Sequence, residues 1–475
     1  MNPTLPTELT GRVLVAGAGV SGAGCARLLS DLGVDTVVAD DNADALAALV
    51  SACGGRISGI GVADARTRLG EYSLVVTSPG WRPDSPLLVD AAAAHLDVIG
   101  DVELAYRLDR AEVFGPPRTW LVVTGTNGKT TTTAMLAAMM TQAATDSGRR
   151  AEAVGNIGVA VSDALADPDR VDVLVAELSS FQLHWSTELT PDAGVLLNLA
   201  EDHIDWHGSF DAYADDKARV LTGPVAVAGI DDPHVRSLSA GIRGLIGFTL
   251  GEPARGQFGV IDGRLIDHTG DEPVELAPVE GIEPPGPAGI YDALAAAAIA
   301  RSQGATPDHI AAALDSFAVA GHRGQIVATG GGVRWIDNSK ATNPHAADAA
   351  LAGLDRVIWL AGGQLKGADV TDLITTHAHR LKAVGLLGQD GQAIATALRD
   401  LAPDVPVEIT DLTDPVAAMD TLVDLVTPHL EDGDTVLLAP AAASLDMYTG
   451  MGQRGDLFTA AARRVAGAAP EPEES

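Results

Sequence analysis

The sequence predicts an α/β protein of three domains, each built on a mostly parallel sheet. Short apolar runs that end in glycine or polar residues alternate along the chain with alanine-rich stretches of helical periodicity, as in parallel sheets joined by helical crossovers. The chain has 475 residues, and an average domain takes about 150. We expect domains at 1–99, 100–319 and 320–475, with a tail (467–475) too polar and proline-rich to pack.

The first domain begins with a strand, a glycine-rich turn and a helix, in RVLVAGAGVSGAGCARLL (12–29). VDTVVADD (34–41) supplies a second strand ending in acids, and YSLVVTSPG (72–80) and LDVIGD (96–101) continue the alternation. The turn GAGVSG fits the G-x-G-x-x-G pattern, with Asp40 after the next strand, which by itself suggests a dinucleotide cofactor. Gly115, Pro116 and Pro117 then break the pattern, so the domain should end near residue 100, before a connecting helix.

The second and third domains repeat this alternation. In the second, the expected strands lie in TWLVVTG (119–125), VDVLVAELSS (171–180), DAGVLLNLAEDH (192–203) and GPVAVAGI (223–230). A variable Gly- and Pro-rich section follows at 251–289, and then a helix at 291–304. In the third, the expected strands lie in VRWIDNSKATNP (333–344), RVIWLAGGQLKG (356–367), AVGLLGQD (383–390) and DTVLLAPAAAS (434–444).

Composition excludes several classes of protein. A formal charge of −33 would repel nucleic acid and anionic membranes, which bind through clustered Lys and Arg. Cys25 and Cys53 are the only cysteines and form no CxxC pair, which argues against a disulfide scaffold or a thiolate zinc site. The sequence shows no signal-peptide pattern and no long uncharged apolar run. We therefore expect a cytoplasmic protein that does not insert into membranes.

The stretch VVTGTNGKT (122–130) has the composition of a phosphate-binding turn but an unusual spacing. The common pattern places glycine six residues before the lysine, whereas Val123 stands there and Gly125 is the first glycine. Glycines after a strand let backbone N–H groups face a phosphate at a helix start. Lys129 could then reach the terminal phosphates and the Thr130 hydroxyl could bind Mg²⁺. A turn that binds nothing is the alternative.

Two further strand ends carry possible metal ligands. Glu177 ends an apolar strand, where a buried acid is costly without a cation. His203 stands beside Glu201 and Asp202, although such a cluster taken alone is more often a solvated loop. Together with Lys129, they fall on successive strand ends of one predicted sheet.

At this point the sequence resembles the ATP-dependent Mur ligases of bacterial cell-wall synthesis, along essentially its whole length. The short loop GTNGKTT is the form shared by that family and the related folylpolyglutamate synthetases. The stretches ELSSFQL, DNSKATN, GGQLKGAD and APAAASLDMY…QRGDLF resemble the branch that adds D-glutamate to UDP-N-acetylmuramoyl-L-alanine. The resemblance implies a Rossmann-like N-terminal domain, a central P-loop ATPase-like domain and a Rossmann-like C-terminal domain that takes the amino acid.

The resemblance also implies a role for each matching residue. Catalytic roles fall to Lys129, Glu177, His203, Lys217 and Lys340. ATP contacts fall to Gly125, Thr126, Asn127, Gly128, Lys129, Thr130, Thr131, Asp292, Arg323 and Asn338. Contacts to the UDP substrate fall to Gly19, Val20, Ser21, Asp40, Gly80, Asn156 and Ser179, and contacts to D-glutamate to Thr342, Lys366 and Ser444. Two Mg²⁺ ions would be held by Thr130, Glu177, His203 and a carbamylated Lys217.

The implied reaction activates the L-alanyl carboxylate as an acyl phosphate, which the amine of D-glutamate attacks. We expect a monomer whose third domain closes on the others. The sequence departs from the family at AGIYD (288–292), which leaves Asp292 as the polar counterpart of an adenosine contact, and at Met451, where an aromatic is common. A folylpolyglutamate synthetase, an NAD-dependent dehydrogenase and a non-catalytic nucleotide switch are the rival readings.

Overall fold

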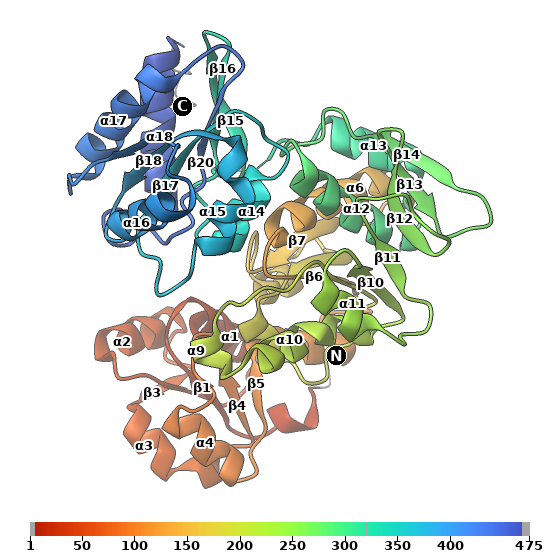
Figure 1. Cartoon of the computed structure of the whole chain (residues 1–475). Helices are drawn as coiled ribbons and strands as arrows, with labels where there is room; N and C mark the ends of the chain where they lie inside the picture. The colour runs from red at the N-terminus through yellow and green to blue at the C-terminus, as the bar shows by residue number, and fades with distance from the viewer. Residues whose placement is uncertain (1–4, 320, 468–475) are drawn as a thin grey trace. The chain divides into compact units, whose positions relative to one another are not determined.

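The computed structural model describes residues 5–319 and 321–467, which form three separate sheets (Figure 1). The chain divides into two compact units, 1–277 with 292–314 and 278–291 with 315–475. The first unit holds the N-terminal and central sheets, and the second holds the C-terminal sheet. Most neighbouring strands run parallel, which confirms the α/β class. The exact boundaries of three domains stay a prediction, and tail residues 468–475 lie outside the described residues.

The N-terminal sheet has the strand order β3-β2-β1-β4-β5, with all its pairs parallel. Side chains of α1 and α5 (Asp101–Arg110) pack in the core on one face, and those of α3 and α4 pack on the other. In this strand order the sequence runs outward in one direction from β1 and in the other from β4. The boundary between β1 and β4 is the position at which such sheets bind ligands. The strands are β1 (Val13–Ala16), β2 (Thr36–Ala39), β3 (Ser58–Ile60), β4 (Leu74–Thr77) and β5 (Val98–Gly100), and the helices are η1 (Thr7–Leu9), α1 (Val20–Asp31), α2 (Ala43–Ala52), α3 (Val62–Thr67), η2 (Leu69–Glu71) and α4 (Pro86–Ala93).

The central sheet has the order β14-β13-β12-β11-β10-β9-β6-β8-β7. The expected strands are confirmed, and β6 and β8 end at Thr124 and Glu177. The strands are β6 (Thr119–Thr124), β7 (Ala151–Gly155), β8 (Val173–Glu177), β9 (Ala193–Leu196), β10 (Val225–Gly229), β11 (Ile246–Phe248), β12 (Gln257–Ile261), β13 (Arg264–His268) and β14 (Val274–Pro278). The helices are α6 (Lys129–Ser147), α7 (Val161–Ala166), α8 (Ser180–His184), α9 (Ile204–His207), α10 (Phe210–Ala218), η3 (Arg219–Thr222), α11 (Pro233–Ser239), α12 (Pro287–Ser302) and α13 (Pro307–Asp315).

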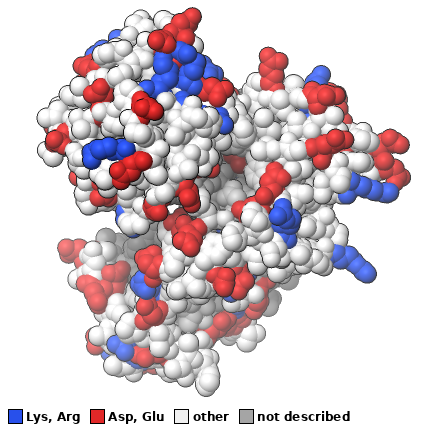
Figure 2. Space-filling view, viewed as in Figure 1, with Lys and Arg blue, Asp and Glu red and all other residues white. Residues whose placement is uncertain are grey.

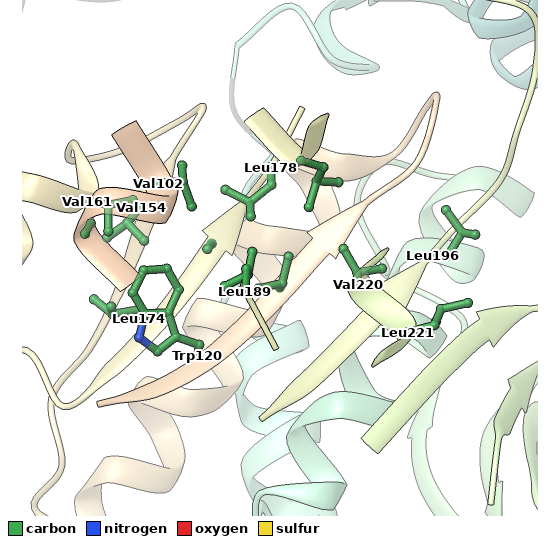
Figure 3. Close-up of a cluster of buried hydrophobic side chains, with 14 of the residues drawn as sticks. Val102, Trp120, Val154, Val161, Leu174, Leu178, Leu189, Leu196, Val220 and Leu221 are labelled. Atoms are coloured by element: carbon green, nitrogen blue, oxygen red, sulfur yellow. The ribbon is translucent and has the colours of Figure 1, made fainter. Parts of the chain in front are cut away.

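Helix α5 (Asp101–Arg110) is the expected connecting helix, and it packs against two cores at once. Leu104 and Leu108 belong to the N-terminal core. Val102 lies with Trp120 of β6 and Leu174 of β8 in the central core (Figure 3). The helix can do this because apolar residues occur on more than one of its faces.

The section 251–289 contains regular structure that its composition does not predict. Strands β12 and β13 form an antiparallel hairpin, with Gln257 opposite His268 and Ile261 opposite Arg264. Together with β14, this hairpin extends one edge of a sheet whose strands from β7 to β12 all pair in parallel. Short, partly exposed strands of this kind lack the continuous apolar run that marks a buried parallel strand.

The C-terminal sheet has the order β15-β16-β20-β17-β18-β19, parallel except for the β15–β16 pair. Helices α14, α15 and α16 cover one face and α17 and α18 the other (Figure 1). The strands are β15 (Gln325–Gly330), β16 (Val333–Asp337), β17 (Val357–Gly362), β18 (Leu381–Leu387), β19 (Val407–Ile409) and β20 (Thr435–Leu438). The helices are α14 (Pro344–Leu351), α15 (Thr371–His377), η4 (Ala378–Arg380), α16 (Gly391–Leu401), α17 (Pro415–Val426), η5 (Thr427–His429) and α18 (Met451–Ala466).

The surface is predominantly acidic. The chain has 64 Asp and Glu against 31 Lys and Arg, and acidic side chains are scattered over the face in Figure 2. Positive charge near an anionic ligand must therefore come from the few lysines and arginines at the site itself. Among the described residues, no helix has the length and apolar character that crossing a membrane requires.

Candidate active site

The loop between β6 and α6 has the backbone geometry of a phosphate-binding turn. The strand ends at Thr124 and the helix begins at Lys129, as predicted. Gly128 precedes the helix in the left-handed region, at φ +83°, and a Cβ there would lie 2.3 Å from Oδ1 of Asp292. Only glycine fits this position without displacing the buried Asp292 side chain. A helix start capped by glycine presents backbone N–H groups, which bind phosphate.

The Asn198 side chain, one of the residues that sequence reasoning missed, holds the loop in shape. The backbone N–H of Asn127 donates to Oδ1 of Asn198 (2.8 Å), and Nδ2 of Asn198 donates to the Asn127 carbonyl (3.1 Å). The Thr126 hydroxyl lies 2.8 Å from the Tyr213 hydroxyl. Lys129 donates through Nζ to the Thr126 carbonyl at 2.9 Å, so its ammonium lies over the loop.

Glu177 and Thr130 form a set of oxygen ligands that fits Mg²⁺. The Thr130 hydroxyl donates to Oε2 of Glu177 at 2.8 Å, and Nδ2 of Asn156 donates to Oε1 at 2.9 Å. Glu177 is buried at the end of β8. A carboxylate and a hydroxyl beside a phosphate loop are the hard oxygen donors that Mg²⁺ prefers. The structure thus brings together Thr130, Glu177 and Asn156, which the sequence places far apart.

Lys217 is buried against the same loop. Its Nζ donates to the carbonyl of Gly125 at 2.8 Å and to the Thr124 hydroxyl at 3.3 Å. Burial, and next the charge of Lys129, lower the pKa of the Lys217 amine well below its ordinary value. The flanking acids Asp215 and Asp216 by themselves suggest an exposed lysine in a surface ion pair, which does not describe this buried side chain.

His203 lies at the N-cap of α9, in the left-handed region at φ +54°. Its side chain is 47% exposed, and its ring lies 4.7 Å from the ring of Phe181. Burial lowers the pKa of the imidazole, Asp202 opposes this, and the charges of Lys217 and Lys129 lower it further. A neutral imidazole is the form that ligates metals.

The glycine turn of the N-terminal sheet lies at the point where strand order reverses. Oδ2 of Asp40, directly after β2, accepts a hydrogen bond from the N–H of Ala18 at 2.7 Å. The Ser78 N–H and hydroxyl both donate to the Ala16 carbonyl, which fixes the loop that leads to Gly80. Gly19, Val20 and Ser21 form the start of α1. Ser179 is the N-cap of α8 in a capping box with Gln182.

In the second unit, loops after β16, β17 and β20 are joined by backbone hydrogen bonds. Asn338 donates to Leu438, Ala441 to Ala341, and Gln364 and Ala443 bond each other. These loops carry Lys340, which is expected to be catalytic, and the three residues expected to contact D-glutamate: Thr342, Lys366 and Ser444. Arg323 precedes β15. Lys366 is exposed with φ +54°, whereas Ser444 is buried.

Arg454 is a further residue that sequence reasoning missed. Its guanidinium is fully buried and donates to Ser339 and to the carbonyls of Gly362 and Ala442. Burial lowers the pKa of Arg454 to about 10. One side chain therefore connects all three loops. The sequence offers one sign of this close packing, the glycine at position 455 inside a helix. A Cβ there would collide with Nδ1 of His322.

Comparisons with known proteins show the family of this chain. The chain matches the Mur ligase middle domain at 123–260 and the Mur ligase glutamate ligase domain at 322–442. It is 63% identical over 459 residues to the UDP-N-acetylmuramoylalanine–D-glutamate ligase of Corynebacterium efficiens, across 96% of this chain and 95% of that protein. The chain belongs to the Mur ligase family. The Mur ligase of the same name from Mycolicibacterium smegmatis is 50% identical, across 96% of this chain and 97% of that protein.

Solved structures support the fold assignment. A pseudomurein peptide ligase type C from Methanothermus fervidus matches 95% of this Mur ligase and 99% of its own chain, with a TM-score of 0.56 and 16% identity. MurF from Acinetobacter baumannii matches 96% and 95%, with a TM-score of 0.57 and 14% identity. At these identities the likeness concerns the fold alone.

Proposed function

We propose that this Mur ligase joins D-glutamate to UDP-N-acetylmuramoyl-L-alanine at the cost of ATP, in peptidoglycan precursor synthesis. The observation that carries the proposal is the near full-length identity to D-glutamate ligases, 46–63% in the relatives compared. The phosphate loop, the Glu177–Thr130 pair and the buried Lys217 give that reaction a physical basis in this chain.

Joining a carboxylate to an amine needs a leaving group that water does not supply. Transfer of the γ-phosphoryl group of ATP to the L-alanyl carboxylate gives an acyl phosphate, which the amine of D-glutamate attacks with release of phosphate. When bound, Mg²⁺ neutralises charge on the phosphates. We propose two such ions. Glu177 and Thr130 would hold the first, and His203 and a carbamylated Lys217 the second.

The other residues of the central domain bind and orient the nucleotide. Gly125 to Thr131 surround the phosphates, with the ammonium of Lys129 near the transferred group. Asp292 lies against Gly128, and its Oδ1 accepts from the Thr132 hydroxyl at 3.2 Å. Asp292 therefore supports the loop through this hydrogen bond. We propose that it also contacts the adenosine. Arg323 and Asn338 stay proposed ATP contacts.

We propose that the UDP part of one substrate and D-glutamate bind at different sheets. We propose that Gly19, Ser21 and Gly80 bind the diphosphate at the strand reversal and Asp40 lies near the uridine, with Asn156 and Ser179 toward the muramoyl group. Lys340, Thr342, Lys366 and Ser444 would bind D-glutamate and the reacting phosphate, because cations are needed near its two carboxylates. A cytoplasmic monomer and a closing C-terminal domain stay predictions.

The test is phosphate release from ATP with UDP-N-acetylmuramoyl-L-alanine and a panel of amino acids. Release should require D-glutamate, and L-glutamate, glycine and D-alanine should give only background. The product's mass should increase by one glutamyl residue. Phosphate release that ignores the amino acid would instead support a nucleotide switch. Tight binding of NAD at GAGVSG, with none of UDP, would favour a dehydrogenase.

A further inference from the structure

Four polar side chains of the central domain form one connected chain of hydrogen bonds, here called the Asp216 cluster: Ser180, His184, His207 and Asp216. Oδ2 of Asp216 lies 2.8 Å from Nδ1 of His184 and 3.0 Å from Nδ1 of His207. Nε2 of His207 lies 3.0 Å from the Ser180 hydroxyl. None of the proposed catalytic steps uses these groups.

One assignment of protons satisfies the whole cluster. With Asp216 ionised, each Nδ1–H donates to its carboxylate, and the Ser180 hydroxyl donates to the bare Nε2 of His207. The inner part of the cluster lies out of water, because the His207 side chain is 0% exposed and that of Asp216 is 8% exposed, whereas His184 at the outer end is 29% exposed. Buried networks with every member satisfied hold a single geometry.

His184, His207 and Asp216 also have donor atoms within 4.8 Å of one another, so they could hold a metal ion themselves. That reading requires both imidazoles to lose the Nδ1 proton that now bonds Asp216. The complete set of hydrogen bonds favours a network of side chains over a site for a metal.

The residues of the Asp216 cluster lie close in the chain to three of the proposed metal ligands. Ser180 begins α8, three residues after Glu177 at the end of β8. His207 ends α9, whose N-cap is His203. Asp216 lies on α10 directly before Lys217. The cluster therefore joins α8, which begins three residues after Glu177, to α9 with its N-cap His203 and to α10, which carries Lys217.

Neighbouring rings leave the cluster little room to rearrange. The ring of Phe181 stacks on His207 with centroids 5.7 Å apart, and the ring of Tyr213 meets His207 edge-on at 5.4 Å. Arg219, one turn along from Asp216, lies 3.4 Å from its Oδ1. The hydrogen bonds and these ring contacts therefore fix the distances between α8, α9 and α10.

We propose that His207 and Asp216 are positioning residues, which set the separation of Glu177, His203 and Lys217 and thereby the affinity of the site for divalent metal. This inference rests on the proposed function. Groups that orient metal ligands from behind typically contribute 10–100-fold to metal affinity, and we expect an effect of about that size here.

Two substitutions at one position separate geometry from charge. Asp216→Asn keeps a carbonyl oxygen that can accept both Nδ1–H bonds, whereas Asp216→Ala removes the acceptor. His377→Gln is the matched control, because Nε2 of His377 lies 2.8 Å from Asp348 and the side chain is 4% exposed, but it lies on α15 in the second unit. Thermal unfolding of all three variants reports any loss of stability separately.

The measurement is Mn²⁺ binding by electron paramagnetic resonance in the presence of a nonhydrolysable ATP analogue, using the full-length protein. We expect Asp216→Ala to raise the Kd for Mn²⁺ by about 10–100-fold. Asp216→Asn should stay within about threefold of wild type, because both bonds to the histidines remain. His377→Gln should lower the melting temperature without changing the Kd.

Three results would contradict the inference in distinguishable ways. If wild type fails to bind Mn²⁺ with the analogue, the proposed function itself fails. If wild type binds and Asp216→Ala binds equally well, the cluster is structural only. If wild type retains one Zn²⁺ that Asp216→Asn loses, the cluster is a metal site and the positioning role is wrong.

Discussion

Nζ of Lys217 lies 2.8 Å from the carbonyl oxygen of Gly125, so a lysine of α10 contacts the first glycine of the phosphate loop. An ammonium at this point would repel a metal ion bound nearby. Because burial and Lys129 lower its pKa, a larger fraction of the amine is neutral than at the surface. The neutral amine is the form that reacts with CO₂, which would turn the cation into an anionic metal ligand.

Lys217→Ala should therefore reduce turnover about 100-fold or more, the usual effect of losing a group that stabilises transition-state charge. Bicarbonate with a small carboxylic acid should restore part of the activity by supplying the missing anion. Lys382→Ala is the control, because Lys382 pairs with Glu431 and Asp434 on the C-terminal sheet. Near-normal turnover of Lys217→Ala would remove the carbamate from the mechanism.

The two ends of α6 offer a paired test of the phosphate loop. Gly128 and Gly148 are both left-handed, at φ +83° and +68°, but a Cβ on Gly128 would collide with Asp292 while a Cβ on Gly148 would meet nothing within 4 Å. Alanine at either end has backbone strain of about 1–2 kcal/mol. Only Gly128→Ala should also abolish binding of an ATP analogue measured by calorimetry. Equal affinity in both variants would exclude the loop as the nucleotide site.

The sequence predicts the fold well because buried parallel strands are continuous apolar runs. The run 119–124 is an example, and its end at Thr124 is visible from the glycines that follow. The hairpin of β12 and β13 escapes prediction because its strands are short and include exposed residues such as Arg264. Pairing partners, and not local composition, define such strands.

Only part of the candidate site is local enough to be read from the sequence. Thr130 lies at the start of α6 and is indicated by a motif, and Glu177 is indicated by its position at the end of β8. Lys217 lies 92 residues from the Gly125 carbonyl that it contacts, and its neighbours Asp215 and Asp216 suggest a surface ion pair. The family resemblance points to Lys217, whereas its burial and its contact with the phosphate loop are seen only in the structure. Arg454 is similar, because a buried guanidinium depends on carbonyls from distant loops.

His322 should make stability of the second unit depend on pH. Nδ1 of His322 lies 2.6 Å from Oδ2 of the buried Asp337, and this bond raises the pKa of the imidazole against the effect of burial. A raised folded-state pKa adds stability that is fully present below the unfolded value of about 6.5 and is lost as pH rises through the folded value. Asp456 adds to this effect and Lys340 opposes it.

His322→Gln should consequently lower the melting temperature by about 2–4 °C at pH 5.5, and by less at pH 8.5. Calorimetry of wild type and variant at both values gives the comparison. A difference that is the same at the two pH values would show that the histidine contributes through packing alone.

Lys366 provides a test of the amino-acid site that leaves the nucleotide site intact. It stands after β17 in the left-handed region, exposed, in a loop held by bonds between Gln364 and Ala443. A charge-assisted hydrogen bond to a carboxylate contributes about 1.5–3 kcal/mol, or about 10–100-fold in affinity. Lys366→Ala should raise the KM for D-glutamate by that factor and leave the KM for ATP unchanged. Arg399→Ala, an exposed cation on α16 of the same sheet, should change neither. If the KM for ATP rises instead, Lys366 binds the reacting phosphate and D-glutamate must be held by other residues.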